Sequence, residues 1–241
     1  MLVRSPSLSA RHGYSTREGG VSTGRYASLN LSYKWGDARE NVDENRRRFG
    51  AAGGFSLHRL YTARQVHGTA VLTVDAASDR EYVASQSADG LVTDVPGIAL
   101  AIGTADCVPV LLSDGHGRIA ALHAGWRGTA GDIVGRGVDA LVALGSERAS
   151  LVAALGPCIC VRCFEVGEEV AAPFEALGAV VRGAGKPHVD LRLANRVLLE
   201  RAGVCEIDDA PPCTMCERDR YFSFRRDGGE IGQQLSFVAS S

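Results

Sequence analysis

The sequence predicts an α+β fold, a single-domain layered sandwich in which helices flank mixed β-sheets and residues 1–241 form the one domain. Strand-like apolar segments come in adjacent pairs, which favours antiparallel or mixed sheets over the strict β-α-β alternation of a doubly wound parallel sheet. No G-x-G-x-x-G follows a predicted strand and no G-x-x-x-x-G-K-S/T loop occurs, so the sequence lacks the two commonest nucleotide-binding signals.

The first half of the chain is expected to combine loops with short strands. Its first forty residues are rich in Ser and Gly. The elements that follow are a helix-permissive segment at 43–49 and strands at 57–62, 70–75 and 97–104. Two further apolar runs, 108–113 and 118–123, are separated by four turn-prone residues, which predicts a β-hairpin.

The second half is expected to mix helices and strands. Apolar residues at helical spacing predict a helix over 129–144 that ends at Gly145. Similar patterns predict helices at 166–177 and 191–202, and strands at 150–155 and 221–225.

Composition and charge narrow the function classes. The formal net charge of −2 and the pI of about 6.3 argue against a nucleic-acid-binding or membrane-surface protein, which would carry a basic excess. The N-terminus lacks the apolar core of a signal peptide, and no run of about 18 apolar residues occurs, so we expect a cytoplasmic protein. In that reducing compartment the seven cysteines are thiols or metal ligands rather than a disulfide framework.

The predicted hairpin brings a cysteine and a histidine close together. If Val108 faces His123, then Cys107 lies beside Ala124 at the open end. Strict pairing puts the Cys107 and His123 side chains on opposite faces, because side chains alternate along a strand. Pro109 cannot donate a ladder hydrogen bond, so we expect an irregular or bulged pairing there that turns Cys107 towards His123.

Three interpretations of Cys107 and His123 stay open at this point. They could bind zinc with another histidine as the third ligand, leaving a fourth position open. They could be a nucleophile and base for acyl transfer, or buried structural residues. Asp106 could fix a ligating histidine, act as a general base, or cap its own loop.

The same residues carry a resemblance to a known family. The segments YSTREGGVSTGRYASLNL, RQVHGTAV, TADCVPVLL, ALHAGWRGTAG and CTMCERDRYFSFRRDGG, with others between them, extend from about residue 14 to 233. The chain resembles the laccase-domain family, also called multicopper polyphenol oxidoreductase-like proteins, whose members act as purine nucleoside phosphorylases.

The resemblance implies a compact α+β sandwich and a zinc site formed by His67, Cys107 and His123. It also implies phosphorolysis of adenosine, inosine and methylthioadenosine, and deamination of adenosine. The partners are then purine nucleosides and phosphate, with neither nucleic acid nor membrane, in a monomer or homodimer. A metal that lowers the pKa of bound water suits the deamination.

Four residues are candidates for binding the substrate. Arg64 and Arg127 are close in sequence to proposed ligands, and an arginine donates two hydrogen bonds to a phosphate. Asn45 and Arg46 match the V-x-x-N-R segment of the family. At Gln233 the chain departs from the family's usual arginine, which Arg225 or Arg226 would have to replace if that arginine meets an anion.

Two alternative functions, a copper enzyme and a cysteine hydrolase, use the same cysteine. Six histidines without a His-x-His pair cannot build a trinuclear copper cluster, but two histidines and a cysteine can hold Cu²⁺, as in a phenol-oxidising enzyme. A Cys107-dependent hydrolase that edits peptidoglycan precursors is the other alternative. Cys213 and Cys216 are interpreted as buried thiols, or as ligands of a structural zinc shared with Cys158, Cys160 or Cys163.

Overall fold

The computed structural model describes residues 1–209 and 212–240. Within these ranges a first sheet has five strands, antiparallel except for a parallel pair at its edge between β6 and β3. Their order is β1 (Leu2–Val3), β2 (Arg11–Ser15), β13 (Gln234–Ala239), β6 (Ala99–Thr104) and β3 (Leu60–Tyr61).

A second sheet has six strands in the same described ranges, with a parallel pair at each edge. Their order is β12 (Glu206–Asp208), β9 (Val152–Leu155), β7 (Val108–Ser113), β8 (Ile119–Ala124), β5 (Gly90–Thr93) and β4 (Val71–Thr73). A small antiparallel ribbon pairs β10 (Val180–Val181) with β11 (His188–Val189).

Helices lie between and outside these strands. The α-helices are α1 (Arg39–Gly53), α2 (Arg80–Ser85), α3 (Trp126–Ala130), α4 (Ile133–Ala143), α5 (Glu168–Ala171), α6 (Leu191–Arg201) and α7 (Phe224–Asp227). Short 3-10 helices are η1 (Gly24–Tyr26), η2 (Leu57–Arg59), η3 (Arg148–Ser150) and η4 (Ala172–Leu177).

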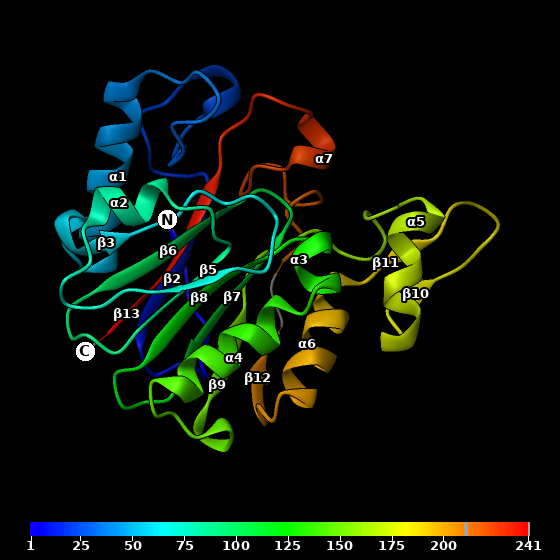
Figure 1. Ribbon diagram of the computed structural model, residues 1–241. Helices are drawn as coiled ribbons and strands as arrows, with labels where there is room; N and C mark the ends of the chain where they lie inside the picture. The colour runs from blue at the N-terminus through cyan, green and yellow to red at the C-terminus, as the bar shows by residue number, and fades with distance from the viewer. Residues whose placement is uncertain (210–211, 241) are drawn as a thin grey trace.

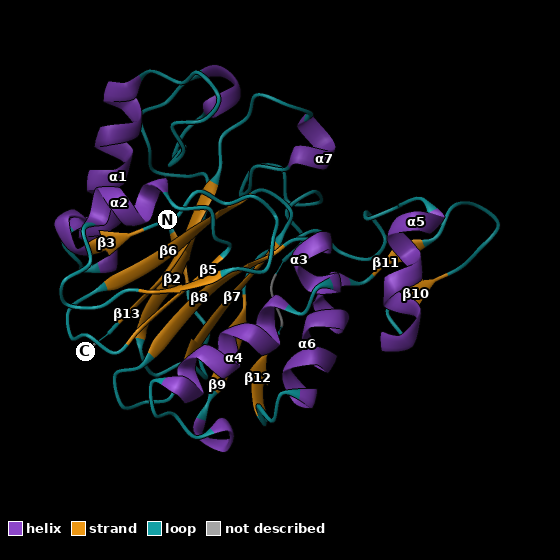
Figure 2. Cartoon of the chain, in the orientation of Figure 1, coloured by secondary structure: helices purple, strands orange, loops and turns teal. Residues whose placement is uncertain are grey.

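The two large sheets pack face to face, and helices cover their outer faces (Figure 1; Figure 2). Leu100 of β6 and Leu111 of β7 belong to the apolar cluster between the sheets. Phe49 of α1 packs with Phe237 on the outer face of the first sheet, and α4 and α6 pack on the outer face of the second. The predicted layered α+β sandwich with mixed sheets is therefore confirmed.

Burial explains why the central strands were recognisable. Every residue of β7 and β8 is buried, because the other sheet covers one face and α4 the other. Strands covered on both faces are continuous apolar runs. The segment carrying α5, β10 and β11 instead projects away from the sheets (Figure 1).

Several predicted elements differ from the observed ones in their bounds. The helix predicted over 129–144 is interrupted at Asp132, whose φ of 59° lies in the left-handed region between α3 and α4. The strand predicted at 57–62 is reduced to β3, because Ser56 caps the 3-10 turn η2 in its first half. The helix predicted at 166–177 starts later, as α5, and continues as η4.

The strand predicted at 221–225 is wrong. Its alternation reflects buried Tyr221 and Phe222 in an irregular segment, and Ser223 then caps α7 by accepting a hydrogen bond from the Arg226 amide. The sequence prediction also omitted β5 and β13. The second of these, at the C-terminal end of the described residues, lies at the centre of the first sheet.

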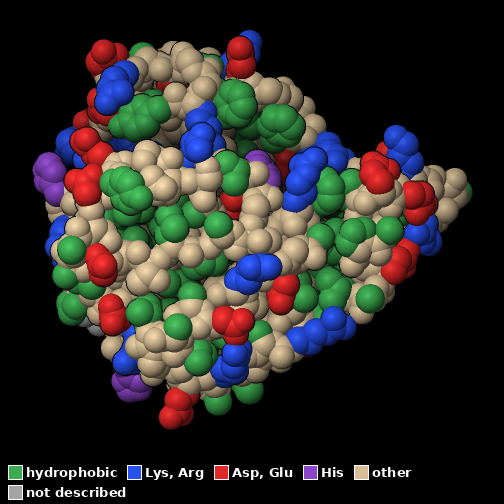
Figure 3. All heavy atoms as spheres, in the orientation of Figure 1, with side chains coloured by type: hydrophobic (Ala, Val, Ile, Leu, Met, Phe, Trp, Pro, Cys, Tyr) green, Lys and Arg blue, Asp and Glu red, His purple; other side chains and the backbone are tan. Residues whose placement is uncertain are grey.

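Two surface features bear on the expected partners. No helix of the described residues is long and apolar enough to cross a membrane. On the face shown in Figure 3, the acidic and basic side chains of the described residues are interspersed rather than gathered into a broad basic patch.

Candidate active site

The chain passes from one sheet to the other immediately before Cys107. β6 belongs to the first sheet and β7 to the second, and residues 105–107 form the corner between them. Asp106 takes a φ of 96° at this corner, a left-handed conformation that few non-glycine residues adopt. Cys107 therefore lies directly before the first residue of β7, next to the last residues of β8.

The register of the hairpin explains how Cys107 and His123 meet. Pro109 pairs with His123, and Val108 pairs with Ala124, one residue away from the predicted register. Since Cys107 precedes Pro109 by two residues, it lies on the same side as His123. The expected bulge at Pro109 is therefore wrong: the ladder is regular there, and the irregular backbone is at Asp106.

His67 lies in a turn whose backbone amides are hydrogen-bonded to the Asp89 carboxylate. The amides of Val66, His67 and Gly68 donate to the two carboxylate oxygens of Asp89 at 3.1, 2.9 and 2.7 Å. His67 itself has a φ of 60°, so these three hydrogen bonds hold an otherwise disfavoured turn.

The same carboxylate orients the second histidine. Oδ1 of Asp89 lies 2.8 Å from Nδ1 of His123, and the His123 amide donates to the Asp89 carbonyl at 2.7 Å. Nδ1 is thereby occupied, which leaves Nε2 of His123 for a ligand. Sequence reasoning missed Asp89. The sequence feature that could have identified Asp89 is an acidic residue directly before an apolar strand, in residues 88–92 (A-D-G-L-V).

The donor set fits a metal ion. Ligand atoms of His67, Cys107 and His123 all lie within 4.8 Å of one another, and the two imidazole rings meet edge to face with centroids 4.8 Å apart. Two imidazoles and a thiolate suit zinc, and the same set can hold copper. Gly125 leaves room for this cluster, since a Cβ there would lie 2.9 Å from the Cys107 sulfur and 3.2 Å from Cδ2 of His67.

Cys107 and His123 shift each other's pKa even without a metal. Burial opposes the thiolate of Cys107, but the charge and hydrogen bonds of His123 and His67 outweigh it and lower its pKa to about 6. Burial likewise opposes the imidazolium of His123, but Cys107 and Asp89 raise its pKa to about 9. Both shifts favour the charged form of the pair, a thiolate beside an imidazolium.

Asp106 does not contact either histidine. Its carboxylate accepts hydrogen bonds from Oγ1 of Thr214 at 2.6 Å and from the amide of Arg225 at 2.7 Å, and its carbonyl accepts one from Ile159 at 2.9 Å. Of the three roles left open for Asp106, fixing a ligating histidine is wrong, because its side chain bonds the C-terminal segment. Asp89 makes that contact instead.

His67, Cys107 and His123 line a cavity of about 480 Å³. That volume falls in the range of roughly 300–1000 Å³ typical of small-molecule sites. Aromatic side chains of Trp35, Trp126, Phe164 and Phe224 form much of the wall. Cationic side chains of Lys34, Arg127 and Arg225 also line it, so the cavity offers apolar faces and positive charge beside the ligands.

Of the four expected substrate-binding residues, Arg127 lines the cavity, with its guanidinium 4.3 Å from the centre of the Trp126 ring. Arg64 donates to Ser87 outside the cavity. Asn45 is fully buried, and its side-chain oxygen accepts a hydrogen bond from the amide of Val21.

Arg46 lies in a separate pocket with Tyr33 and Asp43. None of Arg64, Asn45 and Arg46 lines the cavity, so the structure does not bring these three candidates together with His67, Cys107 and His123. Arg64 is close in sequence to the proposed metal ligand His67, and Asn45 and Arg46 match a family segment. Neither property determines where a side chain points.

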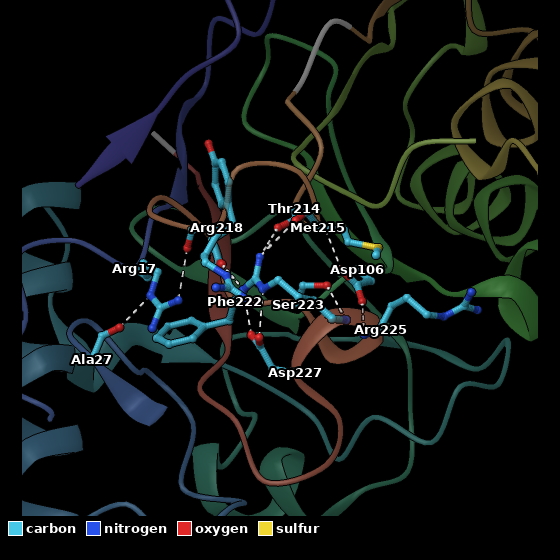
Figure 4. A network of polar contacts seen from close by, with 12 residues as sticks. Arg17, Ala27, Asp106, Thr214, Met215, Arg218, Phe222, Ser223, Arg225 and Asp227 are labelled. Carbon is cyan, nitrogen blue, oxygen red and sulfur yellow. Dashed lines mark hydrogen bonds and ion pairs between the residues drawn. The ribbon is translucent and has the colours of Figure 1, made fainter. Parts of the chain in front are cut away.

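Gln233, at the position where the resemblance implies an arginine, lines the cavity. Of the two arginines expected to replace it, Arg225 lines the cavity and Arg226 does not. Arg226 donates instead to the carbonyls of Thr214, Met215 and Tyr221 and to the Asp227 carboxylate. Thr214, Met215 and Asp227 are labelled in Figure 4.

Comparisons with known proteins show which family the chain belongs to. A family model described as multi-copper polyphenol oxidoreductase laccase matches residues 11–241. A Deinococcus radiodurans protein named purine nucleoside phosphorylase is 45% identical over 98% of this chain and 92% of its own length. A protein of an unknown prokaryotic organism named adenosine deaminase RL5 is 38% identical over 96% of this chain and 95% of its own. The crystal structure of YlmD from Geobacillus stearothermophilus matches with a TM-score of 0.91 at 33% identity, covering 99% of this chain and 96% of that one.

Proposed function

Because the chain belongs to the family described as multi-copper polyphenol oxidoreductase laccase, with relatives named purine nucleoside phosphorylase and adenosine deaminase, we propose that it has both activities and depends on a metal. Its substrates are adenosine, inosine and methylthioadenosine with phosphate, and adenosine with water. The observation that carries the proposal is the meeting of His67, Cys107 and His123 in a cavity with aromatic and cationic walls.

Zinc is the proposed ion, held by Nε2 of His123, the sulfur of Cys107 and the imidazole of His67. When bound, zinc would act as a Lewis acid that lowers the pKa of water and polarises a substrate oxygen or nitrogen. Copper at these residues would instead support phenol oxidation, and metal analysis of protein purified without added copper separates the two.

The chain's own residues position the reactants. Trp126 and Phe164 line the cavity, and each has an arginine over one face of its ring, so a purine would stack on the other face. Arg127 and Lys34 place positive charge where a phosphate can be held. Asp89 orients the His123 ring and holds the turn that carries His67. Asp106 holds the corner before Cys107 because both its oxygens are hydrogen-bonded.

Both reactions have simple atom balances. In phosphorolysis a phosphate oxygen bonds to C1′ of the ribose as the bond from C1′ to N9 breaks, and the purine leaves with a proton. In deamination a water oxygen bonds to C6 of adenine and the amino group leaves as ammonia. Holding phosphate near C1′ therefore matters for the first reaction only.

The test is incubation with adenosine, with and without phosphate, while adenine, ribose 1-phosphate and inosine are measured. Cys107→Ala is expected to lose all three products. Cys205→Ala is the matched control, because Cys205 is exposed and lies outside the cavity. Equal turnover by Cys107→Ala and the wild-type protein would remove the metal-centred mechanism.

A second function, a cysteine hydrolase, is favoured by one observation. Cys107, His123 and Asp89 place a thiol, an imidazole and a carboxylate in series, as in a catalytic triad. The two functions predict different effects of a chelator on the alkylation of Cys107. A metal-bound Cys107 is shielded from alkylation until chelator is added, whereas a nucleophilic Cys107 is alkylated equally with and without chelator.

A further inference from the structure

Four cysteines outside the cavity meet at one place. They come from two C-x-x-C pairs far apart in the sequence, Cys160 with Cys163 and Cys213 with Cys216. Their four sulfur atoms all lie within 4.8 Å of one another. The interpretation of buried thiols is wrong for Cys216, whose side chain is exposed. A gathering of four thiols at the surface therefore needs another explanation.

The backbone builds this gathering from two joined turns. The Cys163 amide donates to the Cys160 carbonyl at 3.0 Å, and the Glu217 amide donates to the Cys213 carbonyl at 3.0 Å. A parallel bridge between Cys158 and Cys213 fixes one turn against the other. The Cys160 amide points at the Cys213 sulfur, 3.3 Å away. Such amide-to-sulfur hydrogen bonds stabilise the negative charge of metal-bound thiolates.

The dimensions suit a single ion. Four sulfurs bonded at about 2.3 Å to a tetrahedral zinc lie about 3.8 Å apart. The sulfurs here are within 4.8 Å of one another, and those of Cys163 and Cys216 are 3.4 Å apart. Small rotations of the side chains would complete the tetrahedron, whereas an iron–sulfur cluster would need room for several atoms between the cysteines.

We propose that Cys160, Cys163, Cys213 and Cys216 form a second metal site, a closed tetrathiolate centre that binds one zinc ion and has a structural role. All four coordination positions are filled by protein, so no place is left for water or substrate. The spacing within each pair is that of structural zinc sites. The site is independent of the proposed catalytic function, since it shares no ligand with His67, Cys107 and His123.

The ion would fasten the C-terminal segment beside the cavity. Thr214 lies within the second C-x-x-C pair, and its hydroxyl donates to Asp106 at 2.6 Å. Arg225, which follows in the same segment, donates its amide to the other oxygen of Asp106. Zinc would therefore tie the corner before Cys107 to the loop that carries Cys160 and Cys163.

Zinc content measured by mass spectrometry of the metal tests the proposal. Wild-type protein purified in reducing buffer is expected to carry about two equivalents of zinc per chain, and Cys163→Ser with Cys216→Ser about one. His67→Ala with His123→Ala is also expected to carry about one, lost from the other site. Cys205→Ser is the control that keeps both. Wild-type protein with one equivalent, all of it lost in the histidine variant, would overturn the proposal.

A measurement on the unaltered chain covers the case in which the serine variants do not fold. Native mass spectrometry with thiol alkylation is expected to show Cys160, Cys163, Cys213 and Cys216 protected until chelator is added, and then modified. Two outcomes would contradict the site. One is a chain with disulfides among these cysteines and no second zinc. The other is four thiols that react freely before any chelator is added.

Discussion

The carboxylate of Asp89 and the imidazole of His123 face one another across the antiparallel strands β5 and β8, with Oδ1 of Asp89 2.8 Å from Nδ1 of His123. The same carboxylate accepts the three amides of the turn that carries His67. One buried side chain therefore fixes two proposed ligands that come from different parts of the chain.

Asp89→Asn is expected to weaken zinc binding by roughly 10- to 100-fold, the usual cost of losing a partner of a ligating histidine. The amide removes the negative charge beside His123 and cannot accept all four hydrogen bonds. Competition with a chromophoric chelator measures the affinity, and circular dichroism checks the fold. Asp94→Asn, an exposed change in the same segment, is the control. Unchanged zinc affinity in Asp89→Asn would refute the assigned role.

Gly125→Ala is expected to weaken zinc binding by about tenfold or more without unfolding the protein, because the new methyl group meets the Cys107 sulfur and the His67 ring. Gly183→Ala is the matched control, since nothing lies within 4 Å of a Cβ at Gly183. If both variants bind zinc like the wild-type protein, then the ligands do not occupy the positions described above.

Arg127→Gln is expected to raise the KM for phosphate by about 10- to 100-fold, from the loss of a charged hydrogen bond worth about 1.5–3 kcal/mol. Deamination uses no phosphate, so inosine production should change little. Arg64→Gln serves as the control, because Arg64 bonds Ser87 outside the cavity. Equal losses of both activities in Arg127→Gln would indicate a general structural defect rather than a phosphate contact.

The strand pair around Cys107 shows how far sequence reasoning reaches. The apolar run 108–113 and the turn after it predicted β7, the hairpin and the closeness of Cys107 to His123. The register was wrong by one residue, because the hairpin loop includes Arg118, whose carbonyl accepts the Asp114 amide. A shift of one residue exchanges the faces of a strand, and only the packed structure fixes it.

Residues that act through distant partners were the least predictable. Asp106 is adjacent to Cys107 in sequence, but its positive φ sends the carboxylate to Thr214 and Arg225. Asp89 is far from both histidines in sequence, and only the pairing of β5 with β8 places it between them. The meeting of the two C-x-x-C pairs depends in the same way on contacts between distant segments.

The hairpin turn predicts a pH dependence of stability. Burial alone would raise the pKa of Asp114, but hydrogen bonds from the His116 amide, Arg118 and Ser146 outweigh it and hold this pKa below its usual value. A carboxylate with a depressed folded pKa stabilises the protein above its unfolded pKa of about 3.9 and loses that contribution as pH falls through the folded value.

Asp114→Asn should therefore lower the free energy of unfolding by about 2 kcal/mol at pH 7. The difference from the wild-type protein should shrink below about pH 4. Urea unfolding of both proteins between pH 7 and 3 measures this. A difference that stays constant over the whole range would show that ionisation of Asp114 contributes nothing.

Anomalous scattering at the zinc edge, from crystals of protein purified without added metal, tests the central claim most directly. The expected result is a peak in the cavity, about 2.0–2.3 Å from the His67 imidazole, the Cys107 sulfur and Nε2 of His123. Protein that still converts adenosine while these three side chains show no metal peak between them would contradict the account.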